Sequence, residues 1–386
     1  MKREIRLTYK GRLSRRQLLA ETEPALLEVQ ETLGQPRLDG WSNRLILGDN
    51  LSVLRALLGD REVAGKVTLV YIDPPFSSDQ QYRVGTTRTA TVSASEQDLP
   101  AYEDRLANAE YLEFLRQRLL LLRELLSEEG SIYVHIDWKM GHYVKLLMDE
   151  VFGAENFLND ITRVKCNPKN FPRRAYGNIK DMVLFYSKTG RHIWHETREA
   201  MTEADIARLF PKVDKNGRRY TTNPLHAPGE TRNGPTGRVW KGLRPPPGRH
   251  WRYNPQEMTR LDEQGLVEWS STGNPRKKIY AEDGVRAGKK RQDIWSWKDP
   301  AYPSYPTEKN LAMLDMIIRA SSRPGDLVAD CFAGSGTTLV ASERLDRCWI
   351  GVDSSPRAIQ TARSRLLAIQ AVRQFTSLRV ASAIAV

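Results

Sequence analysis

The sequence predicts an α/β fold with a largely parallel, doubly wound sheet. Short apolar segments typical of strands alternate with helical segments at both ends of the 386-residue chain, and a basic, proline-rich middle interrupts them. Because both flanks are needed to complete one sheet, we expect the middle to be an insertion. The expected divisions are an N-terminal extension (1–40), a first half of the sheet domain (41–190), the basic insert (191–300) and a second half (301–386).

Strands in the first flank are expected where short β-branched or apolar runs end at turn residues. The run 44–47 stops at the Gly-Asp-Asn triplet 48–50. The run 66–72 stops at Pro74 and Pro75, because proline cannot continue a central strand. The other elements expected in this flank are helices over 51–58, 102–126 and 143–151 and strands over 130–137 and 182–187.

The second flank repeats the alternation. A helix over 311–320 and a strand over 326–330 lead into a glycine-containing loop, 331–338. The elements expected after this loop are a helix running to Leu345, a strand over 348–353 and a helix over 356–371.

Positive charge is concentrated in the middle of the chain. The whole chain has 59 Lys and Arg against 47 Asp and Glu, a net charge of +12. Residues 161–300 alone hold 29 against 15, a net of +14, together with six of the nine tryptophans and 12 of the 21 prolines. Basic residues neutralise phosphates and aromatic residues stack on bases, so this composition is typical of a surface that binds polyanions. Charge alone also fits an ordinary solvated basic face.

Several classes of protein are disfavoured. The longest apolar run, near Leu119 to Leu122, is far shorter than the roughly 20 residues of a membrane span, and the basic start of the chain lacks the apolar stretch of a signal peptide. The three cysteines have no CxxC spacing and the six histidines no HxxxH spacing. We therefore expect a cytoplasmic protein without a membrane segment, with reduced thiols and no metal site.

The first motif that carries chemistry is the loop from Asp330 to Thr338. A strand that runs through a glycine-rich turn into a helix lets the backbone approach a ligand closely. Asp353, at the end of the next strand, lies near the roughly 20-residue offset at which a carboxylate binds ribose hydroxyls. Leu339 replaces the third glycine of a dinucleotide fingerprint, which favours a nucleoside cofactor without a pyrophosphate. The glycines alone also fit a tight structural turn.

The second motif is Asp73-Pro74-Pro75-Phe76, at the carboxyl end of an expected strand. The diproline stiffens a loop in which the Asp73 carboxylate and the Pro74 carbonyl could both accept hydrogen bonds from one amino group. Two such acceptors would draw a nucleobase amine toward sp3 geometry and aim its lone pair at an electrophile. Phe76 would stack on the base. Seen alone, the dipeptide also fits an ordinary turn.

Together, the two motifs resemble those of amino-group DNA methyltransferases, in which FxGxG holds S-adenosyl-L-methionine and (D/N/S)PP(Y/F/W) holds the target amine. The catalytic motif comes first here, which is the order of the circularly permuted β class. The resemblance spans roughly residues 42–370 outside the interior of the insert. Similar stretches are 48–50, 130–137, 180–188 and 305–326, the last being similar to modification subunits of type III restriction systems and to solitary adenine methyltransferases.

The resemblance implies a Rossmann-like, S-adenosylmethionine-dependent methyltransferase fold, circularly permuted, whose insert recognises the target. It implies a catalytic loop made of Asp73, Pro74, Pro75 and Phe76. It also implies a cofactor site, with Asp330 near the amino group of the cofactor and Asp353 at its ribose. Thr307, Lys309 and Asn310 would lie beside the carboxylate of the cofactor, and Asp49 near the adenine ring or the target loop. The loop residues of this site are Phe332, Ala333, Gly334, Ser335, Gly336 and Thr337. Cys331 stands where the family usually has proline.

The implied reaction is transfer of a methyl group to the N6 amino group of adenine in double-stranded DNA at a specific short sequence. Asp73 would orient the amine, and the proton would leave after methyl transfer. The target base would have to be flipped out of the duplex, with the polar segment 77–100 as a flap over it. That segment could instead be an idle surface loop. The resemblance also implies a homodimer and a possible restriction subunit or separate restriction enzyme as partner.

Three alternatives stay open. The same chemistry could act on the N4 amino group of cytosine, although Asp73 favours adenine because cytosine enzymes more often have serine there. The substrate could be another planar amide, such as glutamine in a protein, for which asparagine usually begins the motif. The chain could also be a non-catalytic DNA-binding protein with a relic methyltransferase fold.

Overall fold

The computed structural model describes residues 6–75, 81–84, 99–103, 108–167, 172, 174–231, 233–300, 303 and 308–381. The chain forms two compact units. The main unit contains the residues up to Glu196 and those from Gln292 onward, and the inserted unit is Thr197–Arg291. The inserted unit thus lies within the predicted insert 191–300.

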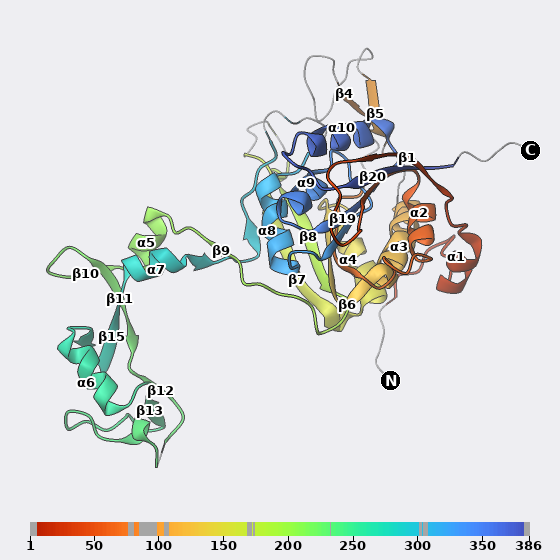
Figure 1. Ribbon diagram of the computed structural model, residues 1–386. Coiled ribbons are helices and arrows are strands. Elements are labelled where there is room, and N and C mark those ends of the chain that lie inside the picture. Colours follow the sequence, from red (N-terminus) through yellow and green to blue (C-terminus); the bar gives the residue numbers. More distant parts are fainter. Residues whose placement is uncertain are drawn as a thin grey trace, which may run out of the picture. The chain divides into compact units, whose positions relative to one another are not determined.

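One ten-stranded sheet organises the main unit (Figure 1). Its six central strands, in the order β20-β2-β19-β18-β3-β6, all run parallel. Antiparallel β1 borders β20, and antiparallel β8 borders β6. The strands, in sheet order, are β1 (Leu27–Leu33), β20 (Phe375–Val380), β2 (Asn43–Leu47), β19 (Cys348–Asp353), β18 (Leu327–Asp330), β3 (Val67–Ile72), β6 (Leu126–Ile136), β8 (Lys180–Ser187), β7 (Phe157–Val164) and β17 (Ile294–Trp295).

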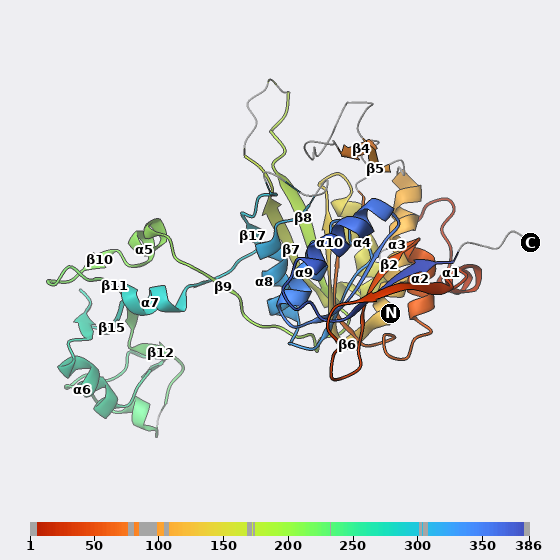
Figure 2. The same ribbon diagram turned by 45° about the horizontal axis from the view of Figure 1, so that its top comes forward.

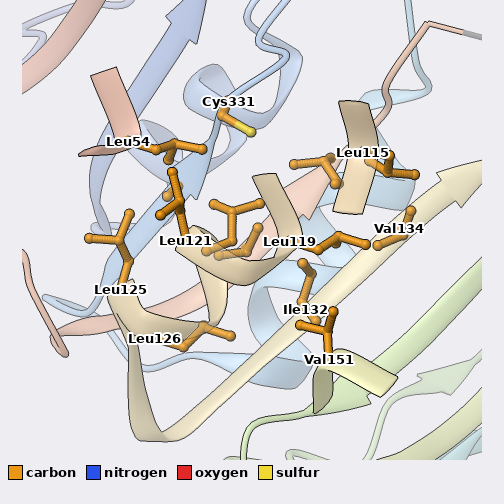
Figure 3. Close-up of a cluster of buried hydrophobic side chains, with 14 of the residues drawn as sticks. Leu54, Leu115, Leu119, Leu121, Leu125, Leu126, Ile132, Val134, Val151 and Cys331 are labelled. Atoms are coloured by element: carbon orange, nitrogen blue, oxygen red, sulfur yellow. The ribbon is translucent and has the colours of Figure 1, made fainter. Parts of the chain in front are cut away.

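Helices cover both faces of this sheet (Figures 1 and 2), because residues of the central strands alternate between two cores. Val70 and Ile72 of β3 belong to the core that α2, α3 and α4 share, whereas Leu69 and Tyr71 of the same strand belong to the core with α8. Figure 3 shows the first core around Leu115 and Leu119 of α3. The helices of the main unit are α1 (Arg15–Glu21), α2 (Asn50–Leu57), α3 (Asn108–Leu125), α4 (Gly141–Phe152), η1 (Ala154–Asn156), α8 (Leu311–Ser321), α9 (Thr337–Arg344) and α10 (Pro356–Leu367).

The predicted doubly wound sheet is confirmed, with three corrections. The helix expected over 102–126 begins at Asn108, because Leu99–Glu103 forms strand β5 and pairs with β4 (Gln81–Val84). The strand expected over 130–137 begins earlier, at Leu126, and the helix expected over 356–371 ends at Leu367. No helix in the described part of the chain is long and apolar enough to cross a membrane.

The inserted unit has its own small core. Leu225, Trp240, Trp251, Met258 and Leu261 are buried together. Its four-stranded sheet has the order β10-β11-β15-β14. The elements of this unit are β9 (Arg198–Glu199), α5 (Glu203–Leu209), β10 (Lys212–Val213), β11 (Arg219–Pro224), β12 (His226–Pro228), η2 (Pro235–Gly237), β13 (Arg249–Trp251), α6 (Pro255–Glu263), β14 (Val267–Trp269), β15 (Pro275–Tyr280), α7 (Ala281–Ala287) and β16 (Lys289–Lys290).

Candidate active site

The two sequence motifs meet because their strands are neighbours. β3 and β18 pair in parallel, with Val70 opposite Ala329, so both strands end at the same edge of the sheet. Asp73 follows the last residue of β3, and Asp330 is the last residue of β18. The chain leaves β18 toward β19 and leaves β3 toward β6, in opposite directions along the sheet. Sheets of this kind bind ligands in the crevice outside the carboxyl ends of the strands, at such a point of divergence.

Asp73 is held by one of its two carboxylate oxygens. The Nζ atom of Lys309 forms an ion pair with Oδ2, and the side chains of Lys309 and Asp73 are 9% and 16% exposed. The other oxygen, Oδ1, is buried and has no hydrogen-bond partner within the described residues. Pro74 is buried and Pro75 half-buried, which fixes the backbone after Asp73. Phe76 lies outside the described residues.

An unpartnered buried carboxylate oxygen is costly, since burial removes its water without replacing the hydrogen bond. Such an atom in a crevice marks a position at which a ligand donates. An amino group fits, because it carries the N–H donors that a carboxylate accepts.

Behind Asp73 lies a buried network that sequence reasoning did not assign to the site. Nδ1 of His135, on β6, is 4.0 Å from Asp73 Oδ1 and 2.8 Å from the Tyr71 hydroxyl. Nε2 of His135 is 3.4 Å from Oδ2 of Asp181, which also accepts from Lys165 through Oδ1 at 2.6 Å. The sequence signal for the location of His135 is its place near the end of the expected strand 130–137, the next strand after the catalytic motif.

Burial and hydrogen bonding act in opposite directions on the two titratable groups of this network. Burial lowers the pKa of His135, although the hydrogen bond to Asp181 acts in the opposite direction. Burial alone would raise the pKa of Asp181, but the interactions with His135 and Lys165 lower it overall. At neutral pH the network therefore consists of a neutral imidazole and an ionised Asp181. A neutral ring behind Asp73 supports the loop without adding a second cation to that of Lys309.

The glycine loop divides into an open part and a packed part. Gly334 has φ of 51°, and a Cβ atom there would have only the Phe332 carbonyl oxygen nearby, at 3.9 Å. Gly336 has φ of 74°, but a Cβ atom there would lie 2.7 Å from Cβ of Ala362 on α10. Gly334 thus leaves room for a ligand against the backbone, whereas Gly336 permits close packing of the loop on a helix.

Two buried carboxylates flank the open part of this loop. Asp330 accepts from the backbone N–H of Phe332 at 3.0 Å, and Asp353 accepts from that of Gly334 through Oδ2 at 2.8 Å. Burial, together with the charges of Asp73 and Asp353, raises the pKa of Asp330 to about 7. Burial also raises the pKa of Asp353. A cationic ligand in this crevice would favour the ionised forms of both carboxylates.

Ser335 and Thr337 face α10 rather than the open part of the loop. The NH1 group of Arg365 donates to the Ser335 hydroxyl at 2.7 Å and to the Thr337 hydroxyl at 3.0 Å. Arg365 also forms an ion pair with Glu308 at 2.9 Å, so it ties the loop to the segment before α8. Ser335 and Thr337 belong to the predicted cofactor loop, but their hydroxyl groups accept hydrogen bonds from Arg365.

The weaker sequence predictions fall at helix starts. Asn310 caps α8 by accepting from the N–H of Met313 at 3.2 Å. Asp49 caps α2 through its Oδ2 atom and receives a hydrogen bond from Arg118 at 3.0 Å on Oδ1. Lys309 is the exception, since it reaches Asp73. Thr307 lies outside the described residues, and of the expected flap 77–100 the structure describes only 81–84 and 99–100.

A second polar link below the glycine loop was missed from the sequence. Asn50 donates to the carbonyl oxygen of Cys331 at 2.7 Å, and Arg118 donates to the amide oxygen of Asn50 at 2.5 Å. Arg118 also stacks on Phe114, whose ring lies 6.0 Å from that of Phe332. This chain of contacts fixes the start of the loop at Cys331, where the family that the sequence resembles usually has proline.

Comparisons with known proteins show the family to which the chain belongs. A sequence profile described as DNA methylase matches residues 67–364. The Type II methyltransferase M.EcaI of Enterobacter cloacae is 39% identical over 367 residues, which cover 94% of this chain and 77% of that protein. The Type III restriction-modification enzyme StyLTI Mod subunit of Salmonella typhimurium is 26% identical over 331 residues, covering 78% of this chain and 49% of that protein. Among solved structures, TTHA0409 of Thermus thermophilus, titled a putative DNA modification methylase complexed with S-adenosyl-L-methionine, has 16% identity and a TM-score of 0.46, covering 88% of this chain and 99% of that chain.

Proposed function

Because the chain belongs to the DNA methylase family, we propose that it methylates the N6 amino group of adenine at a specific short sequence in double-stranded DNA. Family membership confirms two of the expectations from the sequence, a methyltransferase that acts on DNA and S-adenosyl-L-methionine as its cofactor. The choice of adenine, the roles of individual residues and the partners are part of the proposal.

The residues of the crevice fit this cofactor. It carries a cationic sulfonium and an ammonium group, and Asp330 is a carboxylate whose pKa is raised by burial and by the nearby charges of Asp73 and Asp353. Gly334 leaves the loop backbone open to an approaching ligand, and Asp353 lies at the end of the next strand. When bound, the cofactor supplies an electrophilic methyl group. Asp330, Gly334 and Asp353 would bind it, with Lys309 and Asn310 on the side of α8.

The observation that carries the proposal is the state of Asp73. Lys309 occupies Oδ2, so the carboxylate cannot rotate freely, and the buried Oδ1 is left to accept an N–H of the target amine. The Pro74 carbonyl would accept the other N–H. Together they would draw the nitrogen lone pair out of conjugation and point it toward the methyl group. The proton would leave only after the nitrogen has become cationic, because a carboxylate is too weak a base to remove it earlier.

Adenine is favoured over cytosine because the motif begins with aspartate. The N4 amino group of cytosine presents the same two N–H donors to Asp73 and Pro74, so the choice between the bases must be measured. A DNA substrate also favours the predicted cytoplasmic location. The names of the relatives support a role in restriction and modification, with a homodimer and a restriction subunit or separate restriction enzyme as the proposed partners.

The test is to incubate the full chain with isotopically labelled S-adenosyl-L-methionine and unmethylated genomic DNA, digest the DNA to nucleosides and identify the labelled product by mass spectrometry. Label in N6-methyldeoxyadenosine from the wild type, and none from Asp73→Ala, is the expected result. Asp346→Asn is the matched control, because Asp346 is an exposed aspartate in a left-handed conformation that asparagine tolerates.

Other products would change the proposal in defined ways. Label in N4-methyldeoxycytidine would keep the mechanism and replace the base. Cofactor binding without label in any nucleoside would contradict the proposed reaction and favour a protein substrate or a relic fold.

A further inference from the structure

Three arginines of the inserted unit are anchored at every second residue of one short stretch of chain, 222–226. We call Arg249, Arg252 and Arg276 the arginine row. The groups that hold them are all uncharged acceptors. Thr222 accepts from Arg276 through its hydroxyl at 2.8 Å and through its carbonyl oxygen at 2.7 Å. The carbonyl oxygen of Pro224 accepts from Arg252 at 3.0 Å, and Nδ1 of His226 lies 3.3 Å from NH1 of Arg249.

The backbone brings these acceptors close together. β11 pairs with β15 so that Pro224 lies opposite Arg276, and β12 pairs with β13 so that Pro228 lies opposite Arg249. Leu225, at the bend between β11 and β12, is fully buried, while the residues on either side of it are partly exposed. The three arginines therefore form a short array at the junction of the two small sheets.

The charge of this array is not neutralised by the protein. Within the described part of the chain, none of the three arginines forms an ion pair with a carboxylate. Other cations of the same unit do. These pairs are Arg208 with Asp205, Lys212 with Glu268, Arg218 with Glu282, Lys241 with Asp262 and Arg260 with Glu257.

His226 shows that the local field is positive. Burial lowers its pKa, and the charges of Arg249, Arg252 and Arg276 lower it further. The imidazole therefore stays neutral near pH 7 and can accept a hydrogen bond from Arg249. It orients that arginine without adding repulsion.

We propose that the arginine row binds backbone phosphates of the DNA substrate. An arginine fixed by an uncharged acceptor keeps its full charge and has further N–H donors in a planar fork that matches phosphate oxygens. Arg249 and Arg252 are exposed. Strands β12 and β13 lie at one end of the inserted unit, and α5 and α7 lie at the other end (Figures 1 and 2). Asp205 and Arg208, which form an ion pair, belong to α5. The inference rests on the proposed function, since it concerns how that substrate is held.

The test is the salt dependence of binding to a fluorescent DNA duplex, measured with the full chain by anisotropy from roughly 50 to 200 mM salt. Arg249→Gln/Arg252→Gln is the main variant. Arg276 is left intact because its bonds to Thr222 hold two strands of the sheet together. Each lost phosphate contact reduces the slope of log K against log salt by about 0.9, so the double variant is expected to lose about 1.8.

Two kinds of control make this result specific. Arg208→Gln and Arg260→Gln each remove one exposed but paired arginine of the same unit, and we expect the wild-type slope from both. Arg249→Lys/Arg252→Lys restores the charge and should recover most of the slope. A double glutamine variant with the wild-type slope and affinity would overturn the proposal.

Failure of this inference is distinguishable from failure of the proposed function. Methylation of the same duplex by the wild type is measured in parallel, at low salt and with excess duplex. If the wild type methylates DNA and the variant keeps its slope, only the arginine row is wrong. If the wild type methylates no DNA, the proposed function fails whatever the slope.

Discussion

The surroundings of Asp73 and the arginine row differ in how their cations are held. Near Asp73, lysines that are buried or half-buried pair with carboxylates, as in the contacts of Lys309 with Asp73 and of Lys165 with Asp181. In the arginine row the charged side chains are held by uncharged groups, and two of them are exposed. The net charge of a segment does not reveal this difference, because it counts paired and unpaired cations equally.

The difference predicts separate functional consequences. Buried, matched charges fix the geometry of reacting groups, so their loss should change the rate of the chemical step and leave the salt dependence of DNA binding intact. Unmatched surface cations should change the salt dependence and leave the chemical step intact. The following predictions test that separation, starting with the largest expected effect.

Removing Lys309 should impair catalysis most. In Lys309→Met the Oδ2 atom of Asp73 loses its cation, the carboxylate can rotate, and methyl transfer at saturating substrates should fall about 100-fold. The control is Lys145→Met, which removes the lysine of another partly buried Lys–Asp pair, with Asp149 on α4, and should leave the rate within about twofold. Single-turnover kinetics measures both. A changed salt dependence of DNA binding in Lys309→Met would show that this lysine contacts DNA. It would contradict the separation between groups that act in the chemical step and groups that act in DNA binding.

Substitution of the two glycines of the loop, Gly334 and Gly336, should affect protein stability and cofactor binding to different extents. Gly336→Ala combines a left-handed conformation with a contact of 2.7 Å to Ala362, so the free energy of unfolding should fall by about 2–4 kcal/mol. Gly334→Ala has open space around it and should cost about 1–2 kcal/mol of stability while weakening cofactor binding. Denaturant unfolding and cofactor titration distinguish the two. Equal losses of stability would contradict the division of the loop into open and packed parts.

Cofactor affinity should rise with pH. Burial raises the pKa of Asp330 to about 7, so this carboxyl is mostly protonated at pH 6 and mostly ionised at pH 8. Only the ionised form attracts a cation, which predicts up to about tenfold tighter binding of S-adenosyl-L-methionine at the higher pH. Asp330→Asn should bind weakly at both values. Calorimetry at the two pH values provides the measurement, and a pH-independent affinity in the wild type would show that Asp330 does not face the cofactor.

The smallest effect is expected from paired surface charges of the inserted unit. Arg208→Gln should change DNA affinity by less than about twofold, because exposed ion pairs contribute little and the side chain lies away from the arginine row. Competition binding against the wild type can resolve such a difference. A loss as large as that of the double arginine variant would mean that the whole unit, rather than the row, contacts DNA.

Most of the central sheet was predictable from the sequence, because its strands are buried on both faces and are therefore continuously apolar. Val67–Ile72 and Cys348–Asp353 are examples. The edge strand Leu27–Leu33 was not predicted, since Leu27, Thr32 and Leu33 scarcely stand out from the polar residues between them. The last residues of β5, Tyr102 and Glu103, were expected to be helical because Tyr102 continues the helical periodicity, whereas the pairing of β5 with β4 is a tertiary contact.

The site was predictable in its residues but not in its contacts. The motifs indicated Asp73, Gly334 and Asp353, and the alternation of strands brought their loops together. Nothing in the sequence showed that Lys309 would reach Asp73, because the two are far apart in the chain and the packing of α8 against β3 is a tertiary contact. The location of His135 beneath Asp73 likewise follows from the pairing of β3 with β6.

The most direct test of the account is methyl transfer by Asp73→Asn at saturating cofactor and DNA. Lys309 requires an acceptor, so it should bind the amide oxygen of the new side chain and turn the NH2 group toward the target amine, where two donors would face each other. The account predicts a single-turnover rate at least about 100-fold below wild type, with unchanged cofactor affinity and an unchanged salt slope for DNA binding. A rate within about tenfold of wild type would contradict the assignment of Asp73 Oδ1 to the target amine.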